Sequence, residues 1–247
     1  MLDSLKRMFS RQGHDRDLTL MSDWAQQRGH GFKRARGEDG FVIDGRLEGR
    51  PWRIEWGPPQ REYIRGHELR LRMELDLSSD AQMLVLSRPL MDSLERATFE
   101  EFTDNVQTQI GTQTPEEMRW LVMFPKVNLT TSKTLRTHFG AVASVPETGL
   151  DWIEGPLASA LEHAAHGLLR AAPPFVLMTL RGRAYLRTQL DAPDPKAVAA
   201  TLALFEIGVT QALRVVGTGA GRTPDRTGRS TAWQNFPAGG VTGDGTR

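Results

Sequence analysis

Cysteine is absent from this chain of 247 residues. Its absence excludes disulfide bonds, thiolate zinc sites, cysteine-ligated iron–sulfur clusters and catalytic cysteine nucleophiles. Such a composition is common in a reducing compartment, although targeting segments are the better guide to location. The sequence therefore predicts a cytoplasmic protein that folds without a covalent cross-link.

Targeting and membrane-spanning signals are also lacking. Residues 1–12 contain Lys6 and Arg7 but no apolar run after them, so they lack the pattern of a secretory signal peptide. No later apolar run is long enough to span a bilayer. Apolar residues at helical spacing over residues 2–11 predict a short amphipathic helix. Two interpretations of this helix stay open: packing on its own domain, and weak contact with a membrane surface through residues 1–11.

The common catalytic motifs are missing as well. The chain contains no Gly-x-Ser-x-Gly elbow, no Walker loop, no His-Glu-x-x-His motif and no EF-hand loop. Gly217–Gly221 is similar to the start of a dinucleotide-binding loop, but it follows a predicted helix rather than a strand. No helix begins after it to bind a phosphate. These absences favour a protein that is not an enzyme and has no cofactor.

What the chain does contain is ordinary for a folded domain, with 39% hydrophobic and 25% charged residues. At this length a chain forms one large domain or two small ones. We predict an N-terminal amphipathic helix within residues 1–14, an α+β domain over 15–216 and a flexible glycine-rich tail over 217–247. Division of the α+β domain into two subdomains, about 15–110 and 111–216, is an open alternative.

The clearest signal of secondary structure is the strict alternation of apolar and charged residues over residues 68–77. One face of this strand meets a core and the other meets water, which is typical of an antiparallel sheet with one solvated side. Turn sequences separate other short apolar runs, which we also predict to be strands. These runs are Phe32–Arg36, Phe41–Gly45, Trp52–Trp56 and Gln82–Leu86, with a later hairpin of Phe175–Leu180 and Arg183–Leu190.

Apolar residues at helical spacing predict helices before, between and after these strands. The longest begins with Pro195 after an Asp194 N-cap. Another begins near Thr114, with Glu117 as its capping-box carboxylate. The order of elements predicts an α+β fold in which an antiparallel meander and a later hairpin are packed on one face by helices. The remaining predicted helices are Asp17–Arg28, 90–106, Thr131–Val142 and Leu157–Ala171.

Basic and aromatic residues occur together near the middle of the predicted meander. The basic residues within residues 28–72, with Trp52, Trp56 and Tyr63, are ingredients of a sheet that binds single-stranded nucleic acid. Trp52 and Trp56 share one strand face, so we predict that they point into the core while Arg53 and Glu55 face water as cross-strand partners. Because basic and acidic residues are interleaved, we expect no nucleic-acid partner, and single-strand binding is kept only as an alternative.

His163, His166 and Glu162 lie on one side of the predicted helix over residues 157–171. Two imidazoles and a carboxylate at this spacing can form part of a transition-metal site, which needs at least one further ligand. Such a site would support a metal-dependent hydrolase, which is the alternative function. The simpler interpretation is the solvated polar face of an amphipathic helix.

Trp233 and Phe236 are large apolar residues in an otherwise polar tail. They form a candidate docking segment for a protein partner, or they pack back onto the parent domain. Together with the missing catalytic motifs, this segment predicts a non-enzymatic adaptor or chaperone-like protein that binds a protein partner.

Overall fold

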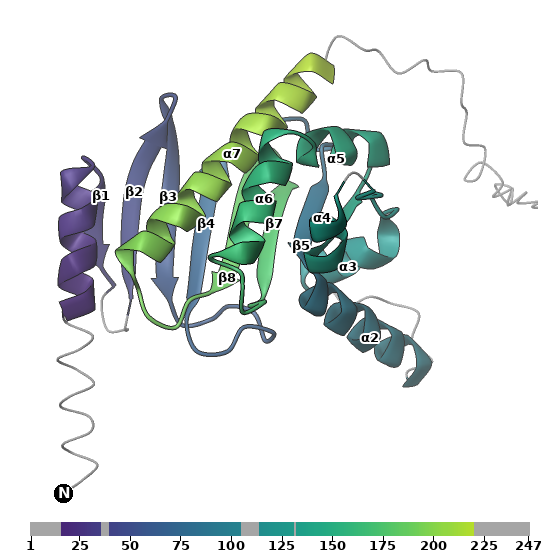
Figure 1. The fold of residues 1–247 in the computed structure, drawn as a ribbon, viewed down its shortest axis with the longest axis horizontal. Helices are drawn as coiled ribbons and strands as arrows, with labels where there is room; N and C mark the ends of the chain where they lie inside the picture. Colours follow the sequence, from purple (N-terminus) through teal and green to yellow (C-terminus); the bar gives the residue numbers. More distant parts are fainter. Residues whose placement is uncertain (1–15, 36–39, 105–113, 131, 220–247) are drawn as a thin grey trace, which may run out of the picture.

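Residues 16–35, 40–104, 114–130 and 132–219 are described by the computed structural model (Figure 1). The amphipathic helix predicted within residues 1–14 lies outside these ranges, and so does the predicted tail from residue 220 onward. Inside them the chain forms one antiparallel sheet with helices packed against it, so the predicted α+β class is confirmed.

All eight strands of the described chain belong to a single sheet in which every neighbouring pair is antiparallel. The predicted meander and the predicted hairpin join edge to edge in it. In chain order the strands are β1 (Gly31–Arg34), β2 (Phe41–Leu47), β3 (Arg50–Gly57), β4 (Glu68–Glu74), β5 (Met83–Ser87), β6 (Phe139–Ala143), β7 (Phe175–Leu180) and β8 (Arg183–Gln189). In space their order is β1-β2-β3-β4-β8-β7-β5-β6.

Local sequence explains the strands and turns of this sheet. Leu69, Leu71 and Met73 alternate along β4 and are buried on the core side, as predicted. The hairpin of β7 and β8 turns at Arg181 and Gly182, whose φ angles are 50° and 75°. Both angles are the left-handed values that a two-residue type I′ turn requires, and such a turn fixes the register of the two strands.

Helices cover one face of the sheet. They are a first helix over residues 16–27, the short α4 (Lys133–His138), α5 (Pro146–Ile153), α6 (Pro156–His166) and α7 (Pro195–Gly219) (Figure 1). Asp194 caps α7 as predicted, because its carboxylate accepts a hydrogen bond from the backbone N–H of Ala197 at 3.1 Å. A hydrogen bond also connects two helices of this layer, because the buried Trp152 indole of α5 donates to the Gly208 carbonyl of α7 at 2.8 Å.

Helix α7 is long and apolar enough, by length and composition alone, to cross a membrane. This finding corrects the sequence-based expectation that no apolar run has such a length. In the structure 56% of the apolar window is buried inside the domain. Val198, Phe205 and Val209 are fully buried in the main core, where the core helix of a folded domain places such residues.

A second group of helices lies on the opposite face, beyond the one-sided packing that the sequence predicts. It consists of α2 (Arg88–Asp104) and α3 (Glu116–Met123), which pack against β5, β6 and β7. Along β5, Leu84 and Leu86 join this second core, whereas Met83 joins the main one. Gly140 on β6 permits the close approach of α2, because a Cβ atom there would lie 1.9 Å from the Met91 Sδ.

The helix predicted over Thr131–Val142 is wrong in its second half. Its described part forms a short helix, α4 (Lys133–His138), and Phe139–Ala143 forms strand β6 instead. All five residues of β6 are buried. A short apolar run of this kind fits a strand or a helix equally well by periodicity, so only its pairing with β5 decides between them.

Other helix predictions differ from the structure in detail. The helix predicted over Leu157–Ala171 ends at His166, because Gly167 leaves the helical conformation at φ −118° and ψ −100°. Leu20 and Phe99 belong to predicted apolar stripes, but their side chains are 46% and 70% exposed. Helix periodicity alone therefore overestimates how much of these two helices faces the core.

Candidate functional site

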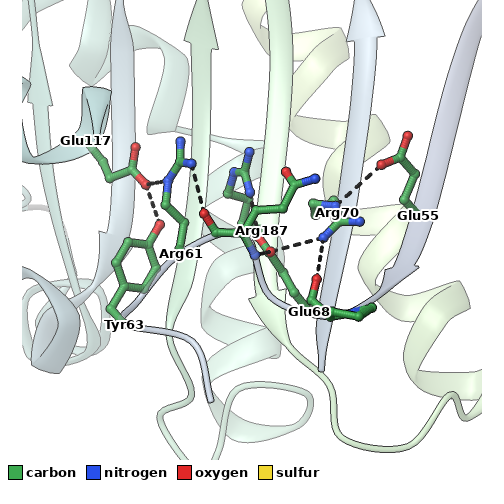
Figure 2. Close-up of polar contacts among 9 residues, drawn as sticks. Glu55, Arg61, Tyr63, Glu68, Arg70, Glu117 and Arg187 are labelled. Atoms are coloured by element: carbon green, nitrogen blue, oxygen red, sulfur yellow. Dashed lines mark hydrogen bonds and ion pairs between the residues drawn. The ribbon is translucent and has the colours of Figure 1, made fainter. Parts of the chain in front are cut away.

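The half of the second sheet face that α2 and α3 leave uncovered carries many charged side chains (Figure 2). This surface, which we call the open face, is the outward side of β1, β2, β3, β4 and β8. Its side chains alternate with core residues, and Trp52 and Trp56 point into the core as predicted. Seven of its side chains are basic and four are acidic: Lys33, Arg46, Arg53, Arg70, Arg72, Arg183 and Arg187, against Asp44, Glu55, Glu68 and Glu74.

Two pairs of arginines occupy directly opposite positions on neighbouring strands of the open face. Arg53 on β3 is opposite Arg72 on β4, and Arg70 on β4 is opposite Arg187 on β8. Like charges in such positions destabilise a sheet. Glu55 offsets part of the repulsion, because its carboxylate oxygens lie 3.4 Å from the Arg70 Nε and 3.7 Å from the Arg72 Nη2.

Glu68 holds the second arginine pair in place. Its carboxylate accepts hydrogen bonds from the Arg187 Nη1 at 2.6 Å, the Arg70 Nη1 at 3.2 Å and the backbone N–H of Gln60 at 2.7 Å (Figure 2). The alternation along β4 predicts a water-facing side chain here, but Glu68 is fully buried. The loop between β3 and β4 accounts for the difference, since Gln60 contacts Glu68 and Arg70 also donates to the Pro58 carbonyl at 2.9 Å.

A second buried carboxylate, Glu117 on α3, lies where the open face meets the helices. The Arg61 Nε donates to its Oε1 at 2.7 Å, and the Tyr63 hydroxyl donates to the same oxygen (Figure 2). Burial raises the pKa of the Glu117 carboxyl, but hydrogen bonding and charge from Arg61 outweigh burial, and the pKa lies below its usual value. Burial and the neighbouring carboxylate raise the pKa of Tyr63. At neutral pH a charged Glu117 therefore accepts a hydrogen bond from the hydroxyl of a neutral Tyr63.

The capping-box role that the sequence predicts for Glu117 is wrong. Helix α3 begins after Pro115 without a hydrogen bond from a capping side chain. The carboxylate instead ties α3 to Arg61 and Tyr63 in the loop between β3 and β4. These partners precede Glu117 by more than fifty residues, so no local motif indicates the contact.

A small hollow of about 130 Å³ opens between the two arginine pairs. Arg72 is the most accessible arginine around it, with 56% of its side chain exposed. A guanidinium group binds a carboxylate through two parallel N–H donors, so this hollow is suited to a carboxylate ligand. The charged and aromatic residues that line it are Arg53, Glu55, Arg70, Arg72, Tyr185 and Arg187.

The predicted metal candidates lie on α6, which covers the other face of the sheet. His163 and His166 are exposed, and Glu162 accepts a hydrogen bond from the Ser132 hydroxyl. The ring centroid of His166 lies 6.2 Å from that of His138. Within the described ranges, no group of three or more histidine, aspartate and glutamate side chains is placed to hold a metal ion. The metal site stays a prediction from the sequence.

Two other predicted contact segments lie outside the described residues. They are Trp233 and Phe236 in the tail and residues 1–11 at the N-terminus. Their roles in protein docking and membrane contact stay predictions, and so does the cytoplasmic location.

Comparison with known proteins identifies no family for this chain. No family model matches it, and no curated protein matches it. Among solved structures, the chain is similar to the crystal structure of the mycobacterial trehalose monomycolate transport factor A, TtfA, with a TM-score of 0.48 and 8% sequence identity. The similarity covers 83% of this chain and 96% of that chain. A likeness of this size carries no conclusion about function.

Proposed function

We propose that this protein is a non-enzymatic binding protein whose open face binds an acidic segment of a protein partner. The observation that carries the proposal is the pair of directly opposed arginine couples, Arg53 with Arg72 and Arg70 with Arg187. Repulsion between Arg53 and Arg72 is a cost to the folded protein, and an incoming carboxylate between their guanidinium groups relieves it. In the second couple the buried Glu68 already bridges Arg70 and Arg187 and holds them beside the first. The open face carries three more basic than acidic side chains, so it attracts acidic segments at a distance.

The geometry of the open face favours carboxylates spaced along a protein segment over a nucleic-acid backbone. Trp52 and Trp56, which would stack on bases, are buried in the core. Asp44 and Glu55 are interleaved with the arginines and repel a continuous row of phosphates. A peptide with separated acidic side chains places each carboxylate near an arginine and avoids the acidic positions.

The arginines are also held ready for a ligand. The Asp44 carboxylate accepts hydrogen bonds from the Arg53 Nε at 2.7 Å and the Arg53 Nη2 at 3.3 Å. Glu68 anchors Arg70 and Arg187 from beneath the loop. Side chains already fixed in this way lose less conformational entropy when a ligand binds, which raises the affinity for a given set of contacts.

The test uses a fluorescent peptide of ten glutamates as the acidic probe, measured by fluorescence anisotropy at low ionic strength. We expect saturable binding that weakens as salt is added. Replacing Arg72→Glu is expected to weaken it about tenfold, because the change places a second carboxylate beside Glu55. Arg170→Glu is the matched control, since it makes the same charge change at an exposed position just after α6.

Three outcomes decide the matter. Loss of binding in Arg72→Glu with unchanged binding in Arg170→Glu supports the proposal. Equal weakening in both variants means that net charge alone attracts the peptide, and the open face is then not a specific surface. Tighter binding of a single-stranded oligonucleotide than of the glutamate peptide overturns the choice of partner.

A further inference from the structure

An apolar groove lies at the C-terminal end of α7, between this helix, the start of α5 and the segment that connects β4 to β5. Its volume is about 430 Å³, within the range of cavities that bind small ligands or large side chains. Val145 stands at its edge with 48% of its surface exposed, while Met83 is buried. The apolar residues that line it are Leu77, Ala81, Met83, Val145, Val215 and Val216.

The walls of the groove are already held in position. The Ser144 hydroxyl donates to the Asp80 carbonyl at 2.7 Å, and the Ser144 backbone N–H donates to the Gln82 carbonyl at 2.9 Å. These bonds tie the start of α5 to the segment after β4. The rim carries the carboxylates of Asp76 and Asp80, and the Arg50 Nη1 lies 2.8 Å from the Asp76 Oδ2 and offsets its charge. The groove therefore combines an apolar interior with a polar rim to which Asp80 adds negative charge.

The residues that follow Gly219 in the same chain could fill this groove by their length and composition. Gly217 lines the groove, and the described chain ends two residues later, with 28 residues still to follow. Those 28 residues contain four arginines and two aspartates, so the segment is basic and complements the negative charge of Asp80 on the rim. Trp233 and Phe236 are their two aromatic residues, and Trp233 follows Gly219 by 14 positions. Fourteen residues span up to about 50 Å when extended, which is ample to return to a groove at their own root.

We propose that residues 233–236 of the same chain occupy this groove, with the Trp233 and Phe236 side chains against its apolar walls. A short covalent link gives the segment an effective concentration in the millimolar range at the groove, so even weak apolar contacts fill it. A separate partner protein or a second copy of the chain lacks this link, so it reaches such a local concentration at the groove only when its own concentration in solution is equally high. This inference is independent of the proposed function, because the groove lies away from the arginine pairs of the open face.

The absence of cysteine makes a direct distance measurement simple, because a single introduced cysteine takes a nitroxide spin label at one position only. The label is attached in the full-length chain through Asn235→Cys, between the two aromatic residues. Methyl NMR spectra then report how strongly it broadens the signals of Val145 and Val216. We expect strong broadening at both valines, and its loss when Trp233→Ala and Phe236→Ala are added. Val241→Ala is the matched control in the same tail and is expected to leave the broadening unchanged.

Mixing experiments separate the tail from other occupants of the groove. Spin-labelled protein without isotope label is mixed with isotope-labelled protein without spin label. Broadening of Val145 in this mixture means that a second copy fills the groove, and this overturns the proposal. Absence of broadening within the labelled chain also overturns it. A synthetic peptide of residues 226–241, added to the Trp233→Ala and Phe236→Ala variant, is expected to shift the valine signals only at about millimolar concentration.

Discussion

The two halves of the second sheet face can be compared along one row of side chains that crosses six strands. On β2, β3, β4 and β8 the row is charged or polar, and from β7 onward it is apolar. The change falls within a single hairpin, between Tyr185 and its partner Met178. Strand alternation is the same on both sides, so what differs is only whether helices cover the face. The row consists of Asp44, Arg53, Arg72, Tyr185, Met178 and Leu84.

The open half has charged side chains at the same positions where the covered half has apolar ones. Its sequence is therefore that of a solvent-exposed surface and not that of a core that has lost its covering helices. Helices α2 and α3 stop at the boundary, where Glu117 is tied to Arg61 and Tyr63. The covered half contributes a second core, and the open half contributes guanidinium groups arranged in opposed pairs. Substitutions of exposed residues in the open half should therefore lower binding, whereas substitutions of buried residues should lower stability.

The largest effect is expected from Trp120→Ala in the covered half. Trp120 is buried in the second core, and removing a buried tryptophan side chain costs about 3 to 5 kcal/mol of unfolding free energy. Urea denaturation followed by circular dichroism measures it. Arg72→Ala in the open half should change the unfolding free energy by less than about 0.5 kcal/mol. Similar losses in both variants would break the contrast between the halves.

A nearly equal effect is expected from Glu68→Gln, which places a neutral amide beneath two arginines. Removing one charge from a buried ion-pair cluster costs about 3 kcal/mol, because Arg70 and Arg187 then lose their shared counter-charge. The matched control is Glu74→Gln on the same strand, where the exposed pair with Arg183 is worth at most about 1 kcal/mol. Equal unfolding midpoints for the two variants would show that the buried ion pairs of Glu68 contribute no more to the unfolding free energy than the exposed pair of Glu74.

A smaller effect is expected from Tyr63→Phe at the boundary. The variant removes the hydroxyl that donates to Glu117 and keeps the ring that packs on the second core. A hydrogen bond to a charged group is worth about 1.5 to 3 kcal/mol, and thermal unfolding should show a loss in this range. Full stability in Tyr63→Phe would mean that Arg61 alone satisfies the carboxylate.

Ionisation of Glu117 should make the unfolding free energy depend on pH in the acidic range. Its pKa in the folded state lies below the unfolded value near 4.5, so the stabilisation is complete above that pH and is lost as the pH falls toward the folded value. Unfolding free energies at a series of pH values below about 5 are compared for the wild type and Glu117→Gln. The variant should lose less stability on acidification. Parallel curves would contradict a lowered pKa for Glu117.

Local patterns predicted much of this fold because they depend on neighbours in sequence. The alternation in β4, the Arg181–Gly182 turn and the Asp194 cap are each set by a few consecutive residues. Strand β6 was not predictable in this way, since five buried residues have no periodicity that separates a strand from a helix.

The candidate site was less predictable than the fold. The sequence placed Arg53 and Glu55 in water, but the opposition of Arg70 and Arg187 depends on a pairing between strands more than a hundred residues apart. The burial of Glu68 depends on the loop that folds over it. Such contacts are properties of the tertiary structure, and one sequence contains no local pattern for them.

Our proposal is that acidic protein segments bind the open face of the described domain. Its most direct test is an NMR titration of the wild-type protein with the ten-glutamate peptide, observing the Nε–H signals of the arginines. We predict that the signals of Arg53 and Arg72 shift with saturation while that of Arg170 stays in place. Small shifts spread equally over all three arginines, or none at saturating peptide, would contradict the account.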